Sequence, residues 1–468
     1  GVRMWIVPRP RGARAVALRL TVTNAPPPPA AHVLLRSAQG ARELDFAVTW
    51  ERVGDGPLAA WWTTLLVEDL EPDERYQIWA ELGGRRVGPA MARTLPDELP
   101  SDPSRPLSLL LGSCFSYRSD KQGAVGDLPG ILPFARAPHV KLLCGDQVYL
   151  DYPVGQPQPN KDDALRELFL RKYQETWDQG AGPGDRGFGS FLRWGSTVFV
   201  SDDHEFWNEY PMKQLQLSGT WSRDGRERRR RISRELFRAF QEAYGRGDGT
   251  RTLRTIEVGE PGTSGHLEIK VLDGRYFRTR ARAFWPADLE AVRDWLGALS
   301  RPGVLVLNQP IFARAKPGVL PQFEDYGALC GALQRARHDV LVLAGDIHGG
   351  RLARVELTRS HGAPAPTTIH ELIASPMALT RPSAYAKAPA HGTFPAGKVV
   401  TGWRGQRAAV TTQAIVAEDH VASLELLRKG DAVHVTIDFW RPRGLPVKNG
   451  ARRPPGPILR QSARLVLR

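Results

Sequence analysis

Three apolar segments that end in acidic residues decide the fold of this chain: HVKLLCGD at 139–146, STVFVSDD at 196–203 and DVLVLAGD at 339–346. Two further segments, LSLLLGSCF at 107–115 and GVLVLNQP at 303–310, are apolar in the same continuous way. Runs of this kind are typical of central strands that are buried on both faces. They predict a sheet that presents polar side chains at the carboxyl ends of its strands.

Helical patterns alternate with these predicted strands. Apolar residues recur at helical spacing over 162–177, 233–244, 286–299 and 323–337. Beyond residue 350 the pattern returns to strands, with runs such as RLARVEL, TIHELIAS and AVHVTIDFW. This order of elements indicates an α/β fold in which helices pack on sheets.

The first 97 residues have a different pattern and predict an all-β sandwich. Short β-rich runs at 16–22, 32–37, 44–53 and 61–70 are separated by Pro and Gly turns. Leu70, Pro72 and Tyr76 have the spacing of a corner found in fibronectin type III domains, which ties the tyrosine to upstream backbone.

Composition along the chain places the boundaries of the predicted domains. A segment rich in Pro, Ser and Asp predicts a linker over 98–106. We therefore predict a β-sandwich over 1–97 and a catalytic α/β domain with a β-rich C-terminal part over 107–468.

The charge balance is unusually basic for a globular protein. The chain has 468 residues, 41% of them hydrophobic, and a net charge of +14. A basic surface attracts phosphates and nucleic acids. The densest run, RDGRERRRRISREL at 223–236, is interpreted as a solvated helix face, with phosphate or nucleic-acid binding as the alternative. Three cysteines in so long a chain do not predict a disulfide framework.

The sequence predicts no membrane span. No stretch reaches the roughly 18 apolar residues that a transmembrane helix needs. The first residues, GVRMWIVPRP, lack the apolar core of a signal peptide. The compartment stays open between the cytoplasm and export with a leader removed, and the sequence sets no oligomeric state.

Metal-binding residue types stand directly after the predicted strands. In CGDQVYLD at 144–151, Asp146 follows a strand and a glycine, and Tyr149 offers a phenolate three residues later, which suits a hard trivalent ion such as Fe³⁺. Cys114 follows a strand and a Gly-Ser turn and offers a thiolate. Hard cations require several converging carboxylates, and a second metal usually needs one that bridges.

Two further strand ends complete the predicted site. In SDDHEF at 201–206, Asp203 and His204 are adjacent, so that one can bind a metal while the other faces the substrate. In AGDIHGG at 344–350, Asp346 and His348 lie on one side of an extended chain and can reach two neighbouring ions. These segments together predict a two-metal hydrolytic site.

In order and spacing, the motifs Ser-Cys-Phe, Gly-Asp-Gln-x-Tyr-x-Asp, Asp-Asp-His-Glu and Gly-Asp-x-His resemble the alkaline phosphatase D (PhoD-like) family of calcineurin-like metallophosphoesterases. The resemblance extends over about residues 1–375 and includes DGRYFR at 273–278 and VLNQP at 306–310, whereas 210–265 match no pattern of the family. It implies a four-layer αββα metallophosphoesterase sandwich preceded by a fibronectin III or Ig-like β-sandwich.

The resemblance also implies the metals and their ligands. Fe³⁺ would be held by Cys114, Asp146, Tyr149 and His348. Ca²⁺, or another divalent metal, would be held by Asp146, Asp203 and Asp346. Asp202 stands as an alternative or additional ligand beside Asp203, and Asn208 as a residue of the surrounding shell.

The implied reaction is metal-dependent hydrolysis of phosphate monoesters and diesters, with a metal-bridging hydroxide as nucleophile and His204 as general acid. Arg278 or Arg280 would bind the phosphate as a fork. Asp151 and Glu205 would either support the ligands or cap local turns. The alternatives are a nuclease or nucleotide phosphodiesterase on the same site, and a non-catalytic metal-binding protein.

Overall fold

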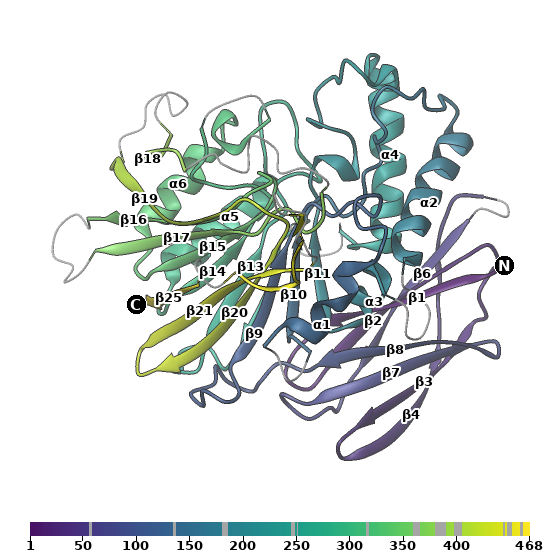
Figure 1. Ribbon diagram of the computed structural model, residues 1–468, viewed down its shortest axis with the longest axis horizontal. Helices are drawn as coiled ribbons and strands as arrows, with labels where there is room; N and C mark the ends of the chain where they lie inside the picture. Colours follow the sequence, from purple (N-terminus) through teal and green to yellow (C-terminus); the bar gives the residue numbers. More distant parts are fainter. Residues whose placement is uncertain are drawn as a thin grey trace.

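A computed structural model of the chain shows a mixed α/β arrangement with several sheets, which confirms the α/β prediction in its coarse form (Figure 1). The residues that the structure describes are 1–55, 59–133, 137–179, 186–244, 249, 251–314, 318–358, 366–379, 390–396, 405–442, 445–446, 452–458 and 462–468.

Two antiparallel sheets built from N-terminal residues pack face to face. The first has the order β1-β2-β6-β5, with β1 at Arg3–Pro10, β2 at Val16–Thr23, β6 at Ala60–Val67 and β5 at Glu51–Val53. The second has the order β4-β3-β7-β8, with β4 at Gly40–Ala47, β3 at Ala30–Ser37, β7 at Arg75–Leu82 and β8 at Arg85–Arg93. Leu18, Leu35 and Ile78 belong to the one apolar core that both sheets share.

Two details of this sandwich bear on the sequence predictions. The predicted strand 44–53 is divided between β4 and β5, which lie in different sheets. Tyr76 accepts a hydrogen bond from the Glu71 backbone N–H to its hydroxyl at 2.9 Å, which is the upstream contact predicted for this tyrosine.

The two larger sheets lie in the part of the chain after residue 106, and a second apolar core lies between them. One has the order β11-β10-β9-β20-β21-β24, with β25 also paired to β21; its strands are β9 Leu107–Gly112, β10 Val140–Cys144, β11 Ser196–Val200, β20 Val421–Lys429, β21 Ala432–Arg441, β24 Gly456–Pro457 and β25 Ala463–Leu467. Strands β9, β10 and β11 are parallel. Leu111, Leu142 and Val198 pack in one cluster with apolar residues of the other large sheet.

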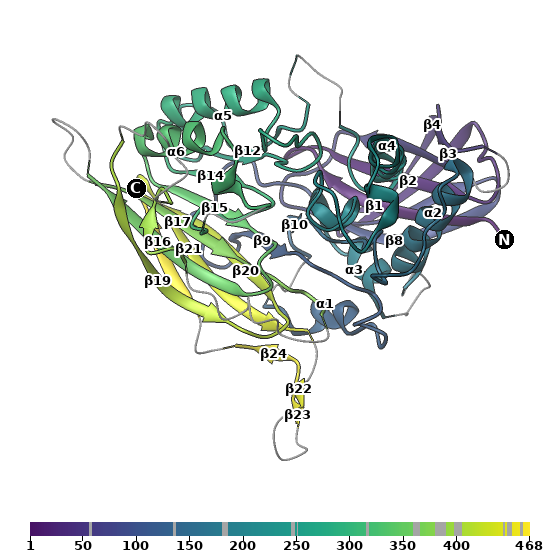
Figure 2. The same ribbon diagram turned by 90° about the horizontal axis from the view of Figure 1, so that it is seen from above.

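The other large sheet has the order β12-β13-β14-β15-β17-β16-β19-β18. Its strands are β12 Arg254–Val258, β13 Leu267–Val271, β14 Gly303–Val306, β15 Val340–Ala344, β16 Gly350–Leu357, β17 Thr367–Ile373, β18 Thr393–Phe394 and β19 Ala408–Val416. Strands β13, β14, β15 and β17 are parallel. A short pair, β22 at Leu445–Pro446 and β23 at Arg452–Arg453, stands apart from both sheets (Figure 2).

Helices cover the outer faces of these two sheets. The helices are α1 Leu128–Ile131, α2 Asp162–Asp178, α3 Phe188–Arg193, α4 Arg223–Phe240, α5 Pro286–Ala298 and α6 Tyr326–Arg335, with 3-10 turns at Ala124–Asp127, Asp203–Glu205, Ser218–Thr220 and Leu320–Gln322. Helices α2, α3 and α4 form a first group, whose residues Phe169, Phe188 and Leu236 pack against the β9–β11 face. Helices α5 and α6 pack on the β14–β15 face (Figure 2).

The structure moves the starts of two predicted helices, and the helix predicted over 323–337 begins at Tyr326. The helix predicted over 233–244 begins at Arg223, so the arginine run is helical. Ser222 sets this start, because its hydroxyl accepts a hydrogen bond from the Gly225 backbone N–H at 3.0 Å and satisfies a free donor of the first turn.

The N-terminal sandwich is fixed against the helices of the first group. Trp5 and Trp62 are part of the core that these helices share with β9–β11. Arg9 donates to the Thr197 carbonyl oxygen at 3.0 Å and pairs with Glu242 at 3.1 Å, both inside this contact. Within the described part of the chain, no helix is both long and apolar enough to cross a membrane.

Candidate metal centre

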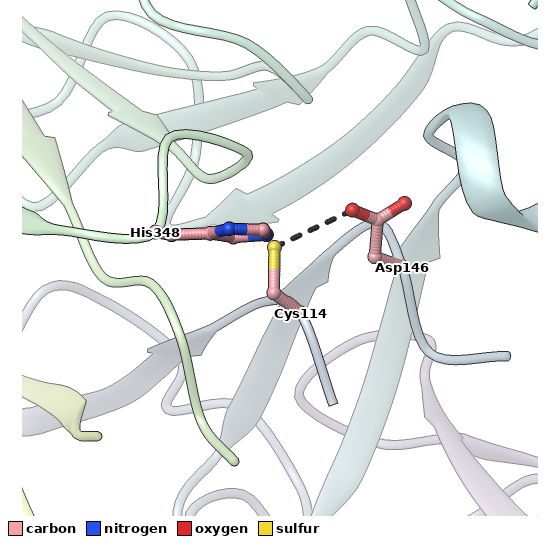
Figure 3. Close-up of side chains that lie close together, drawn as sticks. All are labelled: Cys114, Asp146 and His348. Carbon is pink, nitrogen blue, oxygen red and sulfur yellow. Dashed lines mark hydrogen bonds between the residues drawn. The ribbon is translucent and has the colours of Figure 1, made fainter. Parts of the chain in front are cut away.

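The predicted ligand segments all follow strands whose carboxyl ends meet at one place. Cys114 follows β9, Asp146 follows β10 and Asp203 follows β11 in the first large sheet, and Asp346 follows β15 in the second. Figure 3 shows the side chains of Cys114, Asp146 and His348 converging from three separate segments. The packing of the two sheets therefore joins donors that are far apart in sequence.

The converging side chains form three overlapping sets of donors. One atom from each residue lies within 4.8 Å of the others in the sets Cys114, Asp146 and His348; Asp146, Asp203 and His204; and Asp146, Asp202, Asp203 and Asp346. The Cys114 Sγ lies 3.4 Å from the Asp146 Oδ2. Asp146 belongs to all three sets, as expected of a carboxylate that bridges two cations.

The backbone at these positions is strained. Cys114, Asp146, Asp346 and His348 have φ angles of 57°, 58°, 71° and 51°, in the left-handed region. Such a conformation costs a residue other than glycine on the order of 1–3 kcal/mol and persists only where the surroundings enforce it. The loops are closely packed here: a Cβ atom added to Gly145 would lie 2.4 Å from the Cβ of Asp202.

Asp202 and Asp203, left as alternatives by the sequence, both belong to the set around Asp146. The Asp202 Oδ1 accepts hydrogen bonds from Arg275 Nε at 2.7 Å and from Asn308 Nδ2 at 2.9 Å, whereas its buried Oδ2 has no partner within the described residues. The Asp203 Oδ2 accepts the backbone N–H of Glu209 at 2.7 Å. Each aspartate therefore keeps one oxygen for a cation.

Tyr149 presents a second buried oxygen of this kind. Its ring stacks on the ring of His204 with centroids 4.2 Å apart. Its hydroxyl is buried and makes no hydrogen bond to any described residue. An unsatisfied buried hydroxyl is costly, and coordination to a metal would satisfy it.

The electrostatics of the donor set fit a cation. Burial raises the pKa of Cys114, Asp146 and Tyr149 well above the ordinary values of these groups. The nearby Asp146 carboxylate raises the pKa of Cys114 further, because two negative charges would then share one buried site. A bound metal ion reverses this penalty and favours the anionic forms. The residues therefore fit the metals that the motifs imply.

His204 is held by a carboxylate on the side opposite the donor set. Its Nδ1 lies 2.8 Å from Asp151 Oδ1, and the other oxygen of Asp151 accepts the Asn208 backbone N–H at 2.8 Å. Burial lowers the pKa of His204, but Asp151, Asp146 and Asp203 together raise it well above its ordinary value. Asn208 acts on the site through its backbone.

Glu205 supports the loops that carry the ligands. It is fully buried, and its carboxylate accepts the backbone N–H groups of Asp146 at 2.8 Å and Asp202 at 2.9 Å. It also accepts the Gln147 N–H at 2.7 Å and Gln241 Nε2 at 3.2 Å. Burial raises the pKa of Glu205 to about 7. The open alternatives for this residue both hold, since it supports the ligand loops and also completes a capping box with Asp202.

The two predicted phosphate forks differ in their surroundings. Arg278 is fully buried and donates to the Gly274 carbonyl at 2.6 Å, the Gly318 carbonyl at 3.0 Å and Gln309 Oε1 at 2.9 Å. Its fork is therefore used within the protein. Arg280 is exposed.

Sequence reasoning assigned no role to several residues that contact the ligands. These are Arg275 and Asn308 on Asp202, Gln309 on Asp346, and Ser375 on Cys114. The Gln309 amide donates to Asp346 Oδ2 at 3.0 Å, and the Ser375 hydroxyl lies 3.2 Å from the Cys114 Sγ. The segments DGRYFR and VLNQP contain three of these residues and were the signal that a role existed.

Comparison with known proteins shows a shared fold. The chain is similar to the solved structure of PhoD, with 11% sequence identity, a TM-score of 0.65, and coverage of 98% of this chain and 91% of that one. A cycloisomaltooligosaccharide glucanotransferase from Paenibacillus sp. aligns at 9% identity over 73% of this chain and 45% of its own, with a TM-score of 0.16. No family model matches the chain. No curated protein matches it in sequence.

Proposed function

We propose that this protein is a two-metal phosphoesterase of the alkaline phosphatase D type, which hydrolyses phosphate monoesters and diesters. The observation that carries the proposal is the set of donors that share Asp146, directly beside His204, whose Nδ1 lies 2.8 Å from Asp151 Oδ1. The fold that the chain shares with PhoD supports the same proposal, with the two large sheets and their outer helices as the αββα sandwich and the N-terminal sheets as the fibronectin III or Ig-like sandwich.

The donor types divide between two cations. Cys114, Asp146, Tyr149 and His348 would hold Fe³⁺, for which thiolate and phenolate are suitable ligands. Asp146, Asp203 and Asp346, with Asp202 beside them, would hold Ca²⁺ or another divalent ion that prefers oxygen. When bound, such a metal pair lowers the pKa of water and offsets negative charge on phosphoryl oxygens.

His204 would supply the proton for the leaving group. Asp151 occupies Nδ1 of the ring, so the proton available to a substrate is on Nε2. Transfer of this proton to the leaving oxygen lets an alcohol depart instead of an alkoxide. The stacked Tyr149 ring would fix the plane of the imidazole, and the Asp151 carboxylate raises the pKa of the ring.

Arg275 would hold the carboxylates together before substrate binds. Its guanidinium is buried against Asp202, with 1% and 0% of the two side chains exposed. A fixed positive charge there offsets part of the repulsion among Asp202, Asp203 and Asp346. Its role is therefore to position the ligands, because its nitrogens face Asp202 and the Tyr210 carbonyl oxygen.

The test is turnover of p-nitrophenyl phosphate and bis-p-nitrophenyl phosphate by protein supplied with iron and calcium. We expect both to be hydrolysed. The variant His204→Asn should lower kcat about 10²- to 10⁴-fold with metal content unchanged, which is the range for loss of a general acid. The control His434→Asn, on β21 far from the ligand segments in the chain, should behave as wild type. No turnover of either ester would overturn the proposal.

A further inference from the structure

A cavity of about 370 Å³ with strongly basic walls lies next to the candidate metal centre. Five arginines line it, Arg223, Arg226, Arg230, Arg278 and Arg280, and the one carboxylate among the lining residues is Glu227. Trp207 and Tyr210, which directly follow the His204 segment, form another part of its wall. We refer to this cavity as the arginine pocket.

Most of the positive charge in the arginine pocket is not neutralised. Arg223 and Arg280 are exposed, and neither makes a hydrogen bond or ion pair with any residue that the structure describes. Among the described residues, Arg226 donates only to carbonyl oxygens, those of Thr220 at 2.7 Å and Trp221 at 3.2 Å. Of the five pocket arginines, Arg230 alone pairs with a carboxylate in the described part of the chain, that of Glu227. Such a pocket attracts anions, and guanidinium groups bind phosphate oxygens well.

The arginine pocket and the metal centre are connected by hydrogen bonds. Arg275 donates to the Tyr210 carbonyl oxygen at 2.7 Å and, through its Nε, to Asp202 Oδ1 at 2.7 Å. Arg278 lines the pocket and donates to Gln309 at 2.9 Å, while Gln309 donates to Asp346 at 3.0 Å. A single residue therefore connects the pocket wall to a ligand in each case: Arg275 connects Tyr210 to Asp202, and Gln309 connects Arg278 to Asp346. The pocket and the ligands are therefore close neighbours in the fold.

The rest of the arginine run does not extend this basic surface. Arg228 pairs with Asp162 at 2.8 Å, and Arg231 pairs with the same carboxylate. Arg229 is buried, with its guanidinium 5.2 Å from the centre of the Phe169 ring. Of the four consecutive arginines, only Arg230 lines the pocket. The four arginines at 228–231, which suggested a nucleic-acid surface, therefore lie in three different environments: paired with Asp162, buried against Phe169, and in the wall of the arginine pocket.

The shape and the aromatic wall of the pocket favour a small occupant. Its volume lies in the range of about 300–1,000 Å³ that is usual for small-molecule sites. Proteins that bind single strands offer exposed aromatic faces on which bases stack. Trp207 and Tyr210 are each 1% exposed, and the Trp207 Nε1 is bonded to the Met212 carbonyl oxygen at 2.7 Å. These rings form a wall and offer no free stacking face.

We propose that the arginine pocket binds a second phosphate group of the substrate, so that the preferred substrate is a small molecule with two or more phosphates. One phosphate would lie at the cations that the ligand carboxylates would hold, and another among Arg223, Arg226 and Arg280. The substrate assignment rests on the proposed phosphoesterase function. The binding of phosphate by the pocket does not.

Binding is tested on the full chain, treated with EDTA so that bound metal contributes nothing. Inorganic tripolyphosphate is titrated into wild type and into the double variant Arg223→Gln/Arg280→Gln by calorimetry. We expect one site in the wild type and a Kd about 100-fold higher in the variant, since each charged hydrogen bond contributes about tenfold. Arg85→Gln/Arg335→Gln removes the same charge from exposed arginines on β8 and α6 and should leave Kd unchanged.

Equal Kd values for the pocket variant and wild type would overturn the proposal, as would an equal loss in the control pair. A single-stranded oligonucleotide that binds more tightly than tripolyphosphate, through the same two arginines, would overturn the choice of a small molecule.

A hydrolysis assay tests the role of the pocket in substrate choice separately from the proposed phosphoesterase function. With metals supplied, phosphate release from fructose 1,6-bisphosphate is compared with release from glucose 6-phosphate. The ratio of the two kcat/KM values should fall at least tenfold in Arg223→Gln/Arg280→Gln, and an unchanged ratio would overturn the substrate assignment. Normal tripolyphosphate binding without turnover of any ester would overturn the phosphoesterase function and leave the pocket assignment standing.

Discussion

Replacing Glu205 by glutamine tests how the ligand loops are held. Each carboxylate oxygen of Glu205 accepts two hydrogen bonds: Oε2 from the backbone N–H groups of Asp146 and Asp202, and Oε1 from Gln147 and Gln241. A glutamine offers one oxygen and one NH₂ group. In either orientation, its NH₂ group faces two donors and cannot accept from them.

The magnitude follows from these four contacts. Two N–H groups lose their acceptor in a fully buried place, and each costs about 1–3 kcal/mol. The free energy of unfolding of Glu205→Gln should therefore fall by about 2–6 kcal/mol. Since Asp146 and Asp202 belong to the donor sets, the variant should also retain less metal.

Urea denaturation followed by tryptophan fluorescence measures the first effect, and elemental analysis after gel filtration measures the second. The matched control is Glu290→Gln on α5, where the side chain is exposed. It should change stability by less than about 0.5 kcal/mol, as surface substitutions usually do. A Glu205→Gln variant as stable as this control would refute the role given to Glu205.

Three further predictions concern separate parts of the chain. Asp151→Asn removes a charge that raises the pKa of His204, so kcat should fall about 100-fold with KM and metal content unchanged; wild-type kcat would contradict this. Tyr76→Phe removes the bond to the Glu71 N–H and should destabilise the protein by about 1–2 kcal/mol; an unchanged urea midpoint would refute it. Burial lowers the pKa of His420 to about 4, below an unfolded value of about 6.5. The unfolded chain therefore binds the proton first, and the free energy of unfolding should fall by up to about 3 kcal/mol as the pH drops from about 6.5 to 4. His420→Gln should flatten this fall, and an equally steep fall in the variant would contradict the prediction.

The strand ends could be predicted from the sequence because strands that are buried on both faces are continuous runs of apolar residues. Once β9, β10, β11 and β15 are recognised, the polar residues that follow them must lie near one another, since the parallel strands of each sheet end on one side and the two sheets pack together. Cys114, Asp146 and His348 were placed together in this way.

Other parts of the site depend on contacts that no local pattern records. Arg275 and Arg278 stand three residues apart in one motif, yet the first is directed to Asp202 and the second to Gln309. Their division follows from the position of β14 between β13 and β15, which is a property of the assembled sheet. The left-handed backbone at Cys114 is likewise enforced by tertiary packing, because its residue type predicts the opposite.

The arginine run shows the same limit. Sequence spacing places residues 228–231 around a helix, but the neighbours of α4 decide what each one contacts. Asp162 lies at the start of α2 and pairs with two of the arginines, while Phe169 of the same helix lies under a third. Arg230, the one of these four arginines that lines the arginine pocket, is therefore distinguished by packing alone.

Metal content measured together with activity on one preparation tests the central claim most directly. The purified protein, supplied with iron and calcium and freed of excess by gel filtration, should contain two metal ions per chain, one of them iron. It should absorb visible light through a thiolate or tyrosinate band and hydrolyse bis-p-nitrophenyl phosphate. Cys114→Ser should lose the iron and the band while remaining folded. A protein that binds neither metal and hydrolyses no phosphate ester would contradict the account.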